Sequence, residues 1–253
     1  MNTENNIEKN EKRSDIIAGR NAVTEALKSG RTIDVLFVQN GQKTGSLSVI
    51  IRKAKDKGIT IKEVDSKKLD FMCAGAVHQG VVATAAVKEY SSLDDIFALA
   101  KEKDEAPFII ICDELTDPQN LGAILRTADC SGVHGVIIPK RRSVGLSYAV
   151  GKSSAGAVEY VPVVRVNNLA MTIDELKERG VWIYSADMDG QDYTKTDFKG
   201  SVALVIGAEG KGVQRLVRDK SDFIVSLPMK GKINSLNASV ACGILCYEIL
   251  KQR

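Results

Sequence analysis

The sequence is poor in histidine and in aromatic residues. It holds two His and one Trp among 253 residues, and Phe, Trp and Tyr together make up 5% of it. Structural zinc sites take four Cys or His ligands in closely spaced pairs. Cys242 and Cys246 are spaced one helical turn apart, but no second pair of such residues accompanies them. We therefore expect a protein without a metal site.

Signals for export and for membranes are also lacking. No stretch approaches the ~20 apolar residues that cross a bilayer, and the first residues are polar and do not form an apolar leader. The five cysteines are an odd number, which favours reduced thiols over a disulfide framework. These features predict a cytoplasmic protein that does not enter a membrane.

Common nucleotide-binding signatures are missing as well. The glycines of the segment 207–212 do not follow the Gly-x-Gly-x-x-Gly order of a dinucleotide site. The tripeptide that starts at Gly210 is Gly-Lys-Gly, which lacks the Ser or Thr of a phosphate-binding P-loop. A Rossmann dehydrogenase and a P-loop ATPase are therefore disfavoured.

Composition and periodicity divide the chain into segments. We expect a disordered polar tail at 1–15, a small α/β domain at 16–88, a linker at 89–106 and a larger domain at 107–253. Over residues 16–90, Lys and Arg outnumber Asp and Glu by 12 to 7. This excess is compatible with contacts to nucleic-acid phosphates, and equally with a solubilising surface.

Beyond residue 107, apolar runs of strand length alternate with helical or glycine-rich segments. The expected strands lie at 108–112, 134–138, 160–166, 181–186, 202–206 and 223–227. Runs that are apolar throughout are typical of strands covered on both faces. The pattern predicts an α/β domain with a mostly parallel sheet between helices. Trp182, inside one of these strands, is expected in the core.

A helix with polar residues near its start follows the first of these strands. Asp117 has the position of an N-cap, and Pro118 that of the first helical residue. Apolar residues then recur at helical spacing, at 121, 124, 125 and 128. Asn120 and Arg126 lie outside this apolar stripe, so their side chains are free for other contacts.

Two later segments place polar groups beside strand ends. The strand at 202–206 leads into Gly207–Gly212, a turn that carries Glu209, and glycine lets the backbone approach a ligand closely. A later loop passes through Ser235 and Asn237 into an apolar helix. The free N–H groups at that helix start can be capped by these side chains, or they can face a ligand.

In this order and at these separations, the three segments closely resemble the motifs of the SpoU, or TrmH-like, branch of the SPOUT RNA methyltransferases. The resemblance is closest to the RlmB-type enzymes, which methylate a guanosine ribose in large-subunit ribosomal RNA. Its motifs are carried by Asn120 with Arg126, by Gly207–Gly210, and by Leu227–Met229 with Ser235–Asn237. Near the start of the chain, Ala18–Leu27 and His78–Ala83 resemble the small substrate-binding domain of many members.

The resemblance implies an enzyme that uses S-adenosyl-L-methionine to methylate a ribose 2′-hydroxyl in RNA, and that works as a homodimer. It also implies a trefoil knot in the C-terminal domain and an N-terminal RNA-binding domain similar to ribosomal protein L30e. Knots are exceptional among folds, and hydrophobic periodicity does not reveal them.

The resemblance also assigns roles to single residues. It places Gly207, Leu227 and Leu236 at the cofactor, and it places Asn120, Arg126, Glu209, Ser235 and Asn237 in the catalytic site. All of these positions except Asn120 have a structural alternative. Gly207 could serve only as a turn glycine and the two leucines as core. Arg126 could form a surface ion pair with Asp129, Glu209 could cap its loop, and Ser235 and Asn237 could cap the helix.

Arg126 is the residue that we expect to act on the reacting oxygen. A guanidinium has a pKa above about 12 and is a poor base. We therefore expect it to hold the neighbouring phosphate and to stabilise the developing alkoxide, while a phosphate oxygen or a water molecule accepts the proton. Arg20 and Asn21 belong to the motif of the small domain, and the sequence assigns no chemistry to them.

Other functions stay open at this stage. The same reaction could act on transfer RNA or on an adenosine that is an antibiotic target, or the chain could be a non-catalytic RNA-binding or ribosome-assembly protein with the same fold. The joint presence of Asn120, Arg126, Glu209, Ser235 and Asn237 favours an active enzyme.

Overall fold

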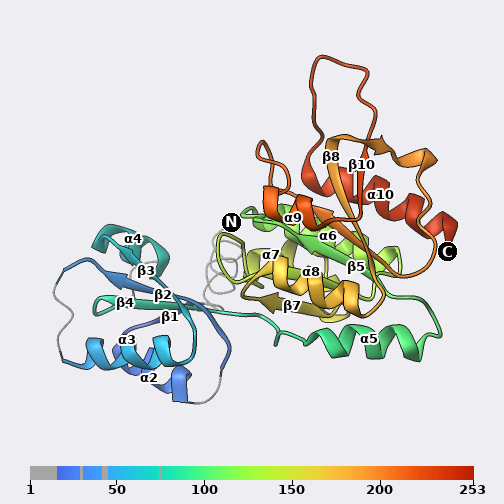
Figure 1. Cartoon of the computed structure of the whole chain (residues 1–253). Helices are drawn as coiled ribbons and strands as arrows, with labels where there is room; N and C mark the ends of the chain where they lie inside the picture. Colours follow the sequence, from blue (N-terminus) through green and yellow to red (C-terminus); the bar gives the residue numbers. More distant parts are fainter. Residues whose placement is uncertain (1–15, 29–30, 42–44, 74–75) are drawn as a thin grey trace, which may run out of the picture. The chain divides into compact units, whose positions relative to one another are not determined.

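A computed structural model describes residues 16–28, 31–41, 45–73 and 76–253 of the chain (Figure 1). The chain separates into two compact units. The first comprises Met1–Glu89 with Gly145–Ala149, and the second comprises Tyr90–Val144 with Val150–Arg253. The expected tail at 1–15 lies outside the described residues.

The first unit contains a four-stranded sheet in the order β1-β4-β2-β3. Its strands are β1 (Ile16–Ala18), β2 (Ile33–Gln39), β3 (Thr60–Val64) and β4 (Val81–Ala85), and its helices are α2 (Arg20–Lys28), α3 (Ser46–Asp56) and α4 (Ser66–Cys73). Val23 of α2 and Ile50 of α3 share one apolar cluster with Leu36 of β2. Leu69 of α4 packs in a separate cluster with Val82 of β4. The sheet therefore has helices against both of its faces.

Strand directions bring several loops of the first unit to one edge of its sheet. β4 runs antiparallel to β1 and to β2, whereas β2 and β3 are parallel. The ends of β1, β2 and β3 and the beginning of β4 must consequently lie at the same edge. The segments that follow β1 and β2 meet the segment that precedes β4 there.

The second unit is built on a six-stranded sheet in the order β10-β8-β9-β5-β6-β7. Its strands are β5 (Phe108–Cys112), β6 (Gly135–Pro139), β7 (Val163–Val166), β8 (Trp182–Asp192), β9 (Val202–Ile206) and β10 (Phe223–Ser226). All five neighbouring pairs are parallel. The expectation of a mostly parallel α/β sheet is confirmed, and five of the six strands keep close to their expected bounds, while β8 is longer.

Helices cover both faces of this sheet. They are α5 (Leu93–Glu102), α6 (Pro118–Cys130), α8 (Leu169–Glu178), α9 (Arg215–Lys220) and α10 (Ala238–Gln252), with short 3-10 turns η1 (Ala157–Glu159) and η2 (Tyr193–Lys195). The short helix α7 (Tyr148–Ser153) is divided between the units, because its first two residues belong to the first unit. Ile109 of β5 lies in one apolar cluster with Ile173 of α8 and Val217 of α9. α6 and α10 pack against each other and lie on the opposite face, where Cys246 of α10 is close to Cys112 of β5.

The stretch 89–106, which we expected to be a linker, belongs to the second unit from Tyr90 onward. α5 begins with a capping box in which Ser92 and Asp95 bond to each other's backbone N–H groups. Ile96 of α5 is fully buried in the core of the second unit. A Cβ atom at Gly135 would lie 2.4 Å from Ile96 Cδ1, so the side chain packs directly on the start of β6. α5 therefore belongs to the second unit because it supplies part of its core.

Trp182 is not a core residue. Its exposed fraction is 53%, whereas the next residue, Ile183, is fully buried. The Trp182 ring packs against the ring of Phe223 in β10, the outermost strand. The ring centroids are 5.8 Å apart and the ring planes are tilted by 57°. Trp182 is the first residue of β8, and Tyr184, on the same face of the strand, is only 2% exposed. The exposure of Trp182 therefore comes from its place at the beginning of the strand.

Candidate functional site

Three loops of the second unit end at one edge of its sheet. They follow β5, β9 and β10, and because all of these strands are parallel, their carboxyl ends face the same way. The first loop leads into α6, the second contains Gly207–Gly212, and the third runs from 227 to 237 into α10. Figure 1 shows this third segment as a long loop that projects beyond the sheet. Such an edge is where open α/β sheets bind ligands.

Asn120, Glu209 and Asn237 form a closed set of hydrogen bonds at this edge. Asn120 Nδ2 donates to Glu209 Oε1 over 3.0 Å, and Asn237 Nδ2 donates to the same oxygen over 2.5 Å. Asn237 Nδ2 also donates to Asn120 Oδ1 over 2.9 Å. Glu209 comes from the second loop, Asn237 from the end of the third, and Asn120 from the first turn of α6, which the first loop enters, so the side chains tie these three segments together. Glu209 Oε2 accepts no hydrogen bond from the part of the chain that the structure describes.

Local structure explains where the two asparagines stand. Asp117 caps α6 by accepting from Gln119 N over 2.9 Å, and Pro118 occupies the first turn, as the sequence predicts. Asn120 is thereby held in the first turn of α6, and only 5% of it is exposed. Asn237 is the N-cap of α10, and its Oδ1 accepts from Ser239 N over 3.0 Å. Asn237 thus caps a helix with its oxygen and holds Asn120 and Glu209 with its nitrogen.

A cavity of about 790 Å³ opens beside these residues. The three residues that we expected at a cofactor, Gly207, Leu227 and Leu236, all line it. Its other walls include Ile206, Met229 and Leu245, and its polar groups include Glu209, Ser235 and Asn237. Cavities that hold cofactors are commonly about 300–1,000 Å³, with apolar walls and a few polar groups that fix orientation.

Gly207 has a clear structural reason to be glycine. A Cβ atom there would lie 2.1 Å from the carbonyl carbon of Gly212, which no packing tolerates. The two ends of this turn are drawn together by a backbone hydrogen bond of 2.8 Å from Gly212 N to the carbonyl of Ala208. The turn therefore requires a glycine at 207, and the same tight turn also forms one wall of the cavity.

Arg126 is not part of this hydrogen-bonded set. It lies about 9 Å further along α6 than Asn120, at 1.5 Å per residue, and its side chain is exposed. Among the described residues it has neither an ion pair nor a hydrogen-bond partner. The ion pair with Asp129, which the sequence left open as an alternative, is therefore not formed in the described protein. Ser235 is exposed in the third loop and lines the cavity. The folded chain leaves both side chains available to a ligand.

Asp113 and Gln214 form a clamp that our sequence reasoning missed. Asp113 is fully buried directly after β5, and its two oxygens accept from Gln214 N and from Gln214 Nε2, each over 2.7 Å. Burial raises the pKa of the Asp113 carboxyl, and the bonds from Gln214 oppose that shift. The clamp fastens the far end of the Gly207–Gly212 turn to β5. An acidic residue immediately after a fully apolar strand was the available signal.

Neither a metal centre nor a membrane-crossing helix is found in the described parts of the chain. In them, no three His, Cys, Asp or Glu residues come together as a potential metal site. No helix in the same ranges is long and apolar enough to cross a bilayer. All five cysteines lie in these ranges, and each has a free thiol.

Comparison with known proteins finds family matches in both parts of the chain. Residues 107–247 match the family described as the SpoU rRNA methylase family, and residues 16–91 match the family described as RNA 2′-O ribose methyltransferase substrate binding. Each of the two matches falls on a different part of the chain, and together they span most of it.

Relatives match over nearly the whole chain. A putative TrmH family tRNA/rRNA methyltransferase of Bacillus subtilis, YacO, is 52% identical over 240 residues, which are 94% of this chain and 96% of the relative. A protein of the same description from Staphylococcus aureus is 48% identical over 239 residues, with coverages of 94% and 96%.

Solved structures show the same architecture. The crystal structure of an AdoMet-bound rRNA methyltransferase from Sinorhizobium meliloti superposes with a TM-score of 0.57 and 25% identity, over 96% of this chain and 89% of that one. From the family match over most of the second unit and the relatives at about half identity, the chain belongs to the SpoU, or TrmH-like, family of RNA methyltransferases.

Proposed function

We propose that this protein transfers a methyl group from S-adenosylmethionine to the ribose 2′-hydroxyl of a guanosine in large-subunit ribosomal RNA. S-adenosylmethionine-dependent ribose methylation of RNA is the activity of the family. The ribosomal guanosine is our own inference. The observation that carries the proposal is the Asn120–Glu209–Asn237 set of hydrogen bonds, which holds polar groups beside a cavity of cofactor size.

The cavity fits S-adenosylmethionine in size and chemistry. When bound, this cofactor supplies an electrophilic methyl group on a sulfonium. We propose that Leu227 and Leu236 pack against the adenine ring, and that the tight turn at Gly207 offers backbone groups to its edge. The Glu209 carboxylate at the rim would favour a positively charged group nearby.

In this proposal, Glu209, Ser235 and Asn237 contact the RNA, and Asn120 positions two of them. Glu209 is oriented through Oε1 and can accept a bond from a sugar hydroxyl or a cation through Oε2. Asn120 is a positioning residue, because it is buried and acts by holding Glu209 and Asn237. Ser235 and Asn237 stand at the start of α10, where backbone N–H groups favour an anion, and they would receive the target nucleotide or its phosphate.

We propose that Arg126 stabilises the oxygen that reacts. Its guanidinium is exposed and has no carboxylate partner among the described residues, so its charge is available to RNA. A fixed cation lowers the free energy of an alkoxide that forms as the 2′-hydroxyl loses its proton. The proton itself would pass to a phosphate oxygen or to water, because a guanidinium is a poor base.

We further propose that the protein is a homodimer in which α10 forms part of the interface. Ala238, Cys242 and Leu245 are on the buried side of α10, whereas Val240 and Tyr247 on its other side are 50% and 54% exposed. A helix that is apolar on all sides is usually covered on all sides. A second copy of the chain is the partner that the family resemblance implies.

The dimer can be tested by placing a charge on this exposed side. Tyr247→Asp should shift the mass in sedimentation equilibrium from two chains toward one, because an interface excludes an unpaired carboxylate. Met171→Asp is the matched control, since Met171 is 69% exposed near the start of α8. Dimers that persist in Tyr247→Asp would reject α10 as the interface.

Three finer features remain proposals. We propose that the C-terminal segment is threaded into a trefoil knot, which is in keeping with the bond between Asn237 and Asn120, 117 residues apart in sequence. Pulling the chain from both ends should then leave it shorter than its full contour length.

We also propose that the first unit is similar to ribosomal protein L30e and binds RNA. We further propose that the protein acts in the cytoplasm, in keeping with its free thiols.

The experiment that tests the function uses methyl-labelled S-adenosylmethionine with unmodified transcripts of large-subunit ribosomal RNA and of transfer RNA. A 2′-O-methyl group blocks alkaline cleavage, so the labelled position should survive as a dinucleotide, with the label on the ribose of a guanosine. Label on a base would reject the chemistry. Label on transfer RNA alone would reject the substrate, and cofactor binding without any transfer would favour the non-catalytic alternative.

A further inference from the structure

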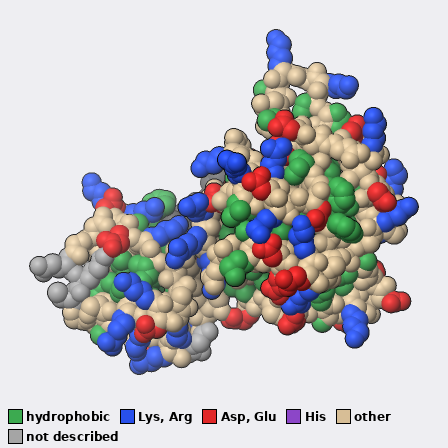
Figure 2. Space-filling view, in the orientation of Figure 1, with side chains coloured by type: hydrophobic (Ala, Val, Ile, Leu, Met, Phe, Trp, Pro, Cys, Tyr) green, Lys and Arg blue, Asp and Glu red, His purple; other side chains and the backbone are tan. Residues whose placement is uncertain are grey.

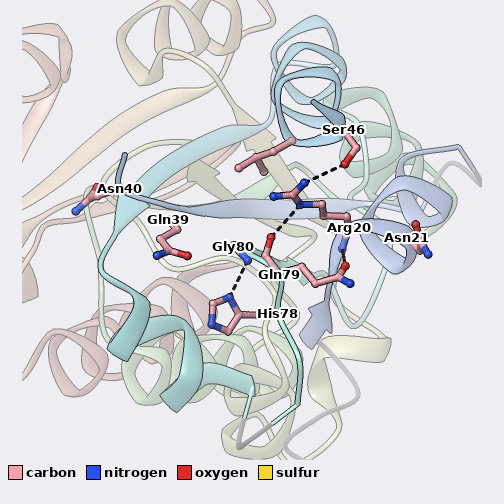
Figure 3. Close-up of a pocket in the computed structure, with 9 residues that line it drawn as sticks. Arg20, Asn21, Gln39, Asn40, Ser46, His78, Gln79 and Gly80 are labelled. Atoms are coloured by element: carbon pink, nitrogen blue, oxygen red, sulfur yellow. Dashed lines mark hydrogen bonds between the residues drawn. The ribbon is translucent and has the colours of Figure 1, made fainter. Parts of the chain in front are cut away.

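The first unit contains a second cavity, which our sequence analysis left without a function. It measures about 770 Å³ and is lined by Arg20 and Asn21 at the start of α2, by Gln39 and Asn40 at the end of β2, and by His78–Gly80 before β4 (Figure 3). These are the segments that strand directions bring to one edge of the sheet. The cavity is therefore a consequence of the topology of the unit.

The frame of this cavity is locked by reciprocal hydrogen bonds between Arg20 and Gln79. Gln79 Oε1 accepts from Arg20 N over 3.1 Å, and Arg20 Nε donates to the Gln79 carbonyl over 3.0 Å. Arg20 Nη1 also donates to Ser46 Oγ over 3.2 Å, at the first residue of α3. Figure 3 shows the guanidinium between Ser46 and Gln79. The guanidinium is thus held in a defined position before any ligand arrives.

His78 forms part of the wall and is already occupied on both ring nitrogens. Its Nδ1 accepts from Gly80 N over 2.9 Å, and its Nε2 lies 3.1 Å from Asp70 Oδ1. Gln79 has a φ of +51° and Gly80 a φ of +81°, so two successive left-handed residues form this turn. The imidazole therefore shapes the turn and leaves the recognition of a ligand to other groups.

Several polar groups of the cavity have no partner within the described ranges. The side chains of Asn21, Gln39 and Asn40 are exposed, and none of them makes a hydrogen bond there. The guanidinium of Arg20 has five N–H groups, of which two are engaged, and no carboxylate forms an ion pair with it in those ranges. The cavity lining contains no Asp or Glu.

This set of groups matches an unpaired nucleotide. Carboxamides both donate and accept, and so can pair with the edge of a nucleobase, while a guanidinium binds phosphate. In a duplex those base edges are already paired, and proteins that read RNA sequence mostly contact unpaired bases in loops and bulges. A concave site is needed to receive such a base. On the face of the first unit in Figure 2, Lys and Arg are more frequent than Asp and Glu, which favours a negatively charged partner such as an RNA strand.

We propose that this cavity holds one unpaired ribonucleotide of the RNA substrate, with Gln39 and Asn40 at the base and Arg20 at the phosphate. The inference rests on the proposed function, which identifies the substrate as RNA. It assigns to the first unit a specific recognition site in addition to general attraction by charge. Substrate choice would then depend on an unpaired nucleotide in addition to the one that is methylated.

The test compares full-length variants for binding to a transcript of large-subunit ribosomal RNA, measured by filter binding at several salt concentrations. Gln39→Ala/Asn40→Ala changes no charge, and should weaken binding about tenfold while the salt dependence stays the same. Arg20→Gln should weaken binding and lower the slope of log K against log salt by about one. The control is Arg52→Gln, an equal loss of charge on the exposed side of α3 outside the cavity, which should change affinity less than about twofold.

Competition shows whether the bound nucleotide is unpaired. A 12-nucleotide single-stranded RNA should displace the transcript from the wild-type protein at lower concentration than the same strand paired with its complement. This preference should disappear in Gln39→Ala/Asn40→Ala. S-adenosylmethionine binding by calorimetry, which we expect to be equal in all variants, checks that each one is folded.

The outcomes separate this inference from the proposed function. If the wild-type protein methylates the transcript and Gln39→Ala/Asn40→Ala binds RNA as tightly as wild type, the cavity proposal is overturned and the proposed function stands. If the wild-type protein binds the transcript through the cavity and transfers no methyl group, the proposed function fails and the cavity stands. Should Arg20→Gln fail to fold, the double variant decides, because its side chains make no hydrogen bonds in the described protein.

Discussion

At the scale of single residues, the proposed site combines side chains that are held with one that is free. Asn120, Glu209 and Asn237 restrain one another, so these polar groups are positioned before any ligand binds. Arg126 has no such restraint among the described residues. The restrained groups suit recognition of ligand atoms at defined places, and the free cation suits a charge that appears during the reaction.

Arg126→Ala should lower turnover by roughly 10²–10³, the scale seen when a group that stabilises an oxyanion is removed. Cofactor binding should stay unchanged, since Arg126 does not line the cavity beside Glu209. Single-turnover kinetics and calorimetry measure the two effects. Arg215→Ala, which removes an arginine that is 94% exposed on α9, is the control. Normal turnover in Arg126→Ala would remove it from the mechanism.

His134 should make stability depend on pH. It is fully buried, its Nδ1 accepts from Phe108 N over 2.9 Å, and burial lowers its pKa. The folded protein therefore binds this proton less readily than the unfolded chain, in which histidine titrates near pH 6.5. The stabilisation is complete above about pH 6.5 and is lost as the pH falls toward the lowered value of the folded state.

Urea unfolding between pH 8 and 5.5 checks this expectation. The free energy of unfolding of the wild-type protein should fall over this range by more than that of His134→Gln, which has no titrating group at this position. Parallel curves for the two proteins would show that His134 is not the group responsible.

At the scale of elements, α10 connects stability with the site, because its N-cap is also a member of the hydrogen-bonded set. Ser239 N and Val240 N both donate to Asn237 Oδ1, while Asn237 Nδ2 donates to Asn120 and to Glu209. Capping needs only an oxygen on a short side chain, whereas the bonds to the other two loops need the amide nitrogen. Substitution can therefore separate the two roles.

Asn237→Ala should lower the free energy of unfolding by about 1 kcal/mol, the usual cost of losing an N-cap. Asn237→Ser restores a capping oxygen and should recover most of this stability, yet methyl transfer should be reduced in both variants because Glu209 loses a partner. Denaturant unfolding and methyl-transfer rates provide the two measurements. Full activity in Asn237→Ser would limit this residue to capping.

Elements also show what local sequence can and cannot predict. The start of α6 follows from Asp117 and Pro118, because capping depends on neighbouring residues only. The burial of Ile96 in α5 depends on its contact with Gly135, which is distant in the sequence. The charged run beyond Ile96 indicated a linker, but α5 packs into the core of the second unit. The exposure of Trp182 likewise depends on its place at the beginning of β8, since Tyr184 on the same face is buried.

At the scale of the whole molecule, the two units are expected to divide the work between cofactor and RNA. A truncated chain of residues 90–253 should fold and bind S-adenosylmethionine, and should lose most of its affinity for RNA. A shorter chain of residues 104–253 lacks α5 and therefore also Ile96. Replacing a buried isoleucine such as Ile96 with alanine alone lowers the free energy of unfolding by about 2–5 kcal/mol. The shorter chain should therefore be clearly less stable. Calorimetry, thermal unfolding and filter binding measure these properties.

Two results would contradict this division. Equal stability of the two truncated chains would show that α5 is dispensable, in spite of its place in the core. Unchanged RNA affinity of the 90–253 chain would show that the first unit, including the cavity at Arg20, does not contact the substrate.

The sequence by itself determined the class of the second unit, the strands of its sheet and the capped start of α6, because hydrophobic periodicity and capping are local in the chain. It also determined which three segments carry polar groups at strand ends. Only the tertiary structure decided that Asn237 bonds to Asn120 across 117 residues, that Asp113 clamps Gln214, and that Arg20 and Gln79 frame a cavity. These contacts depend on strand order and register, which are set by packing of the whole unit and leave no periodic signal in the sequence.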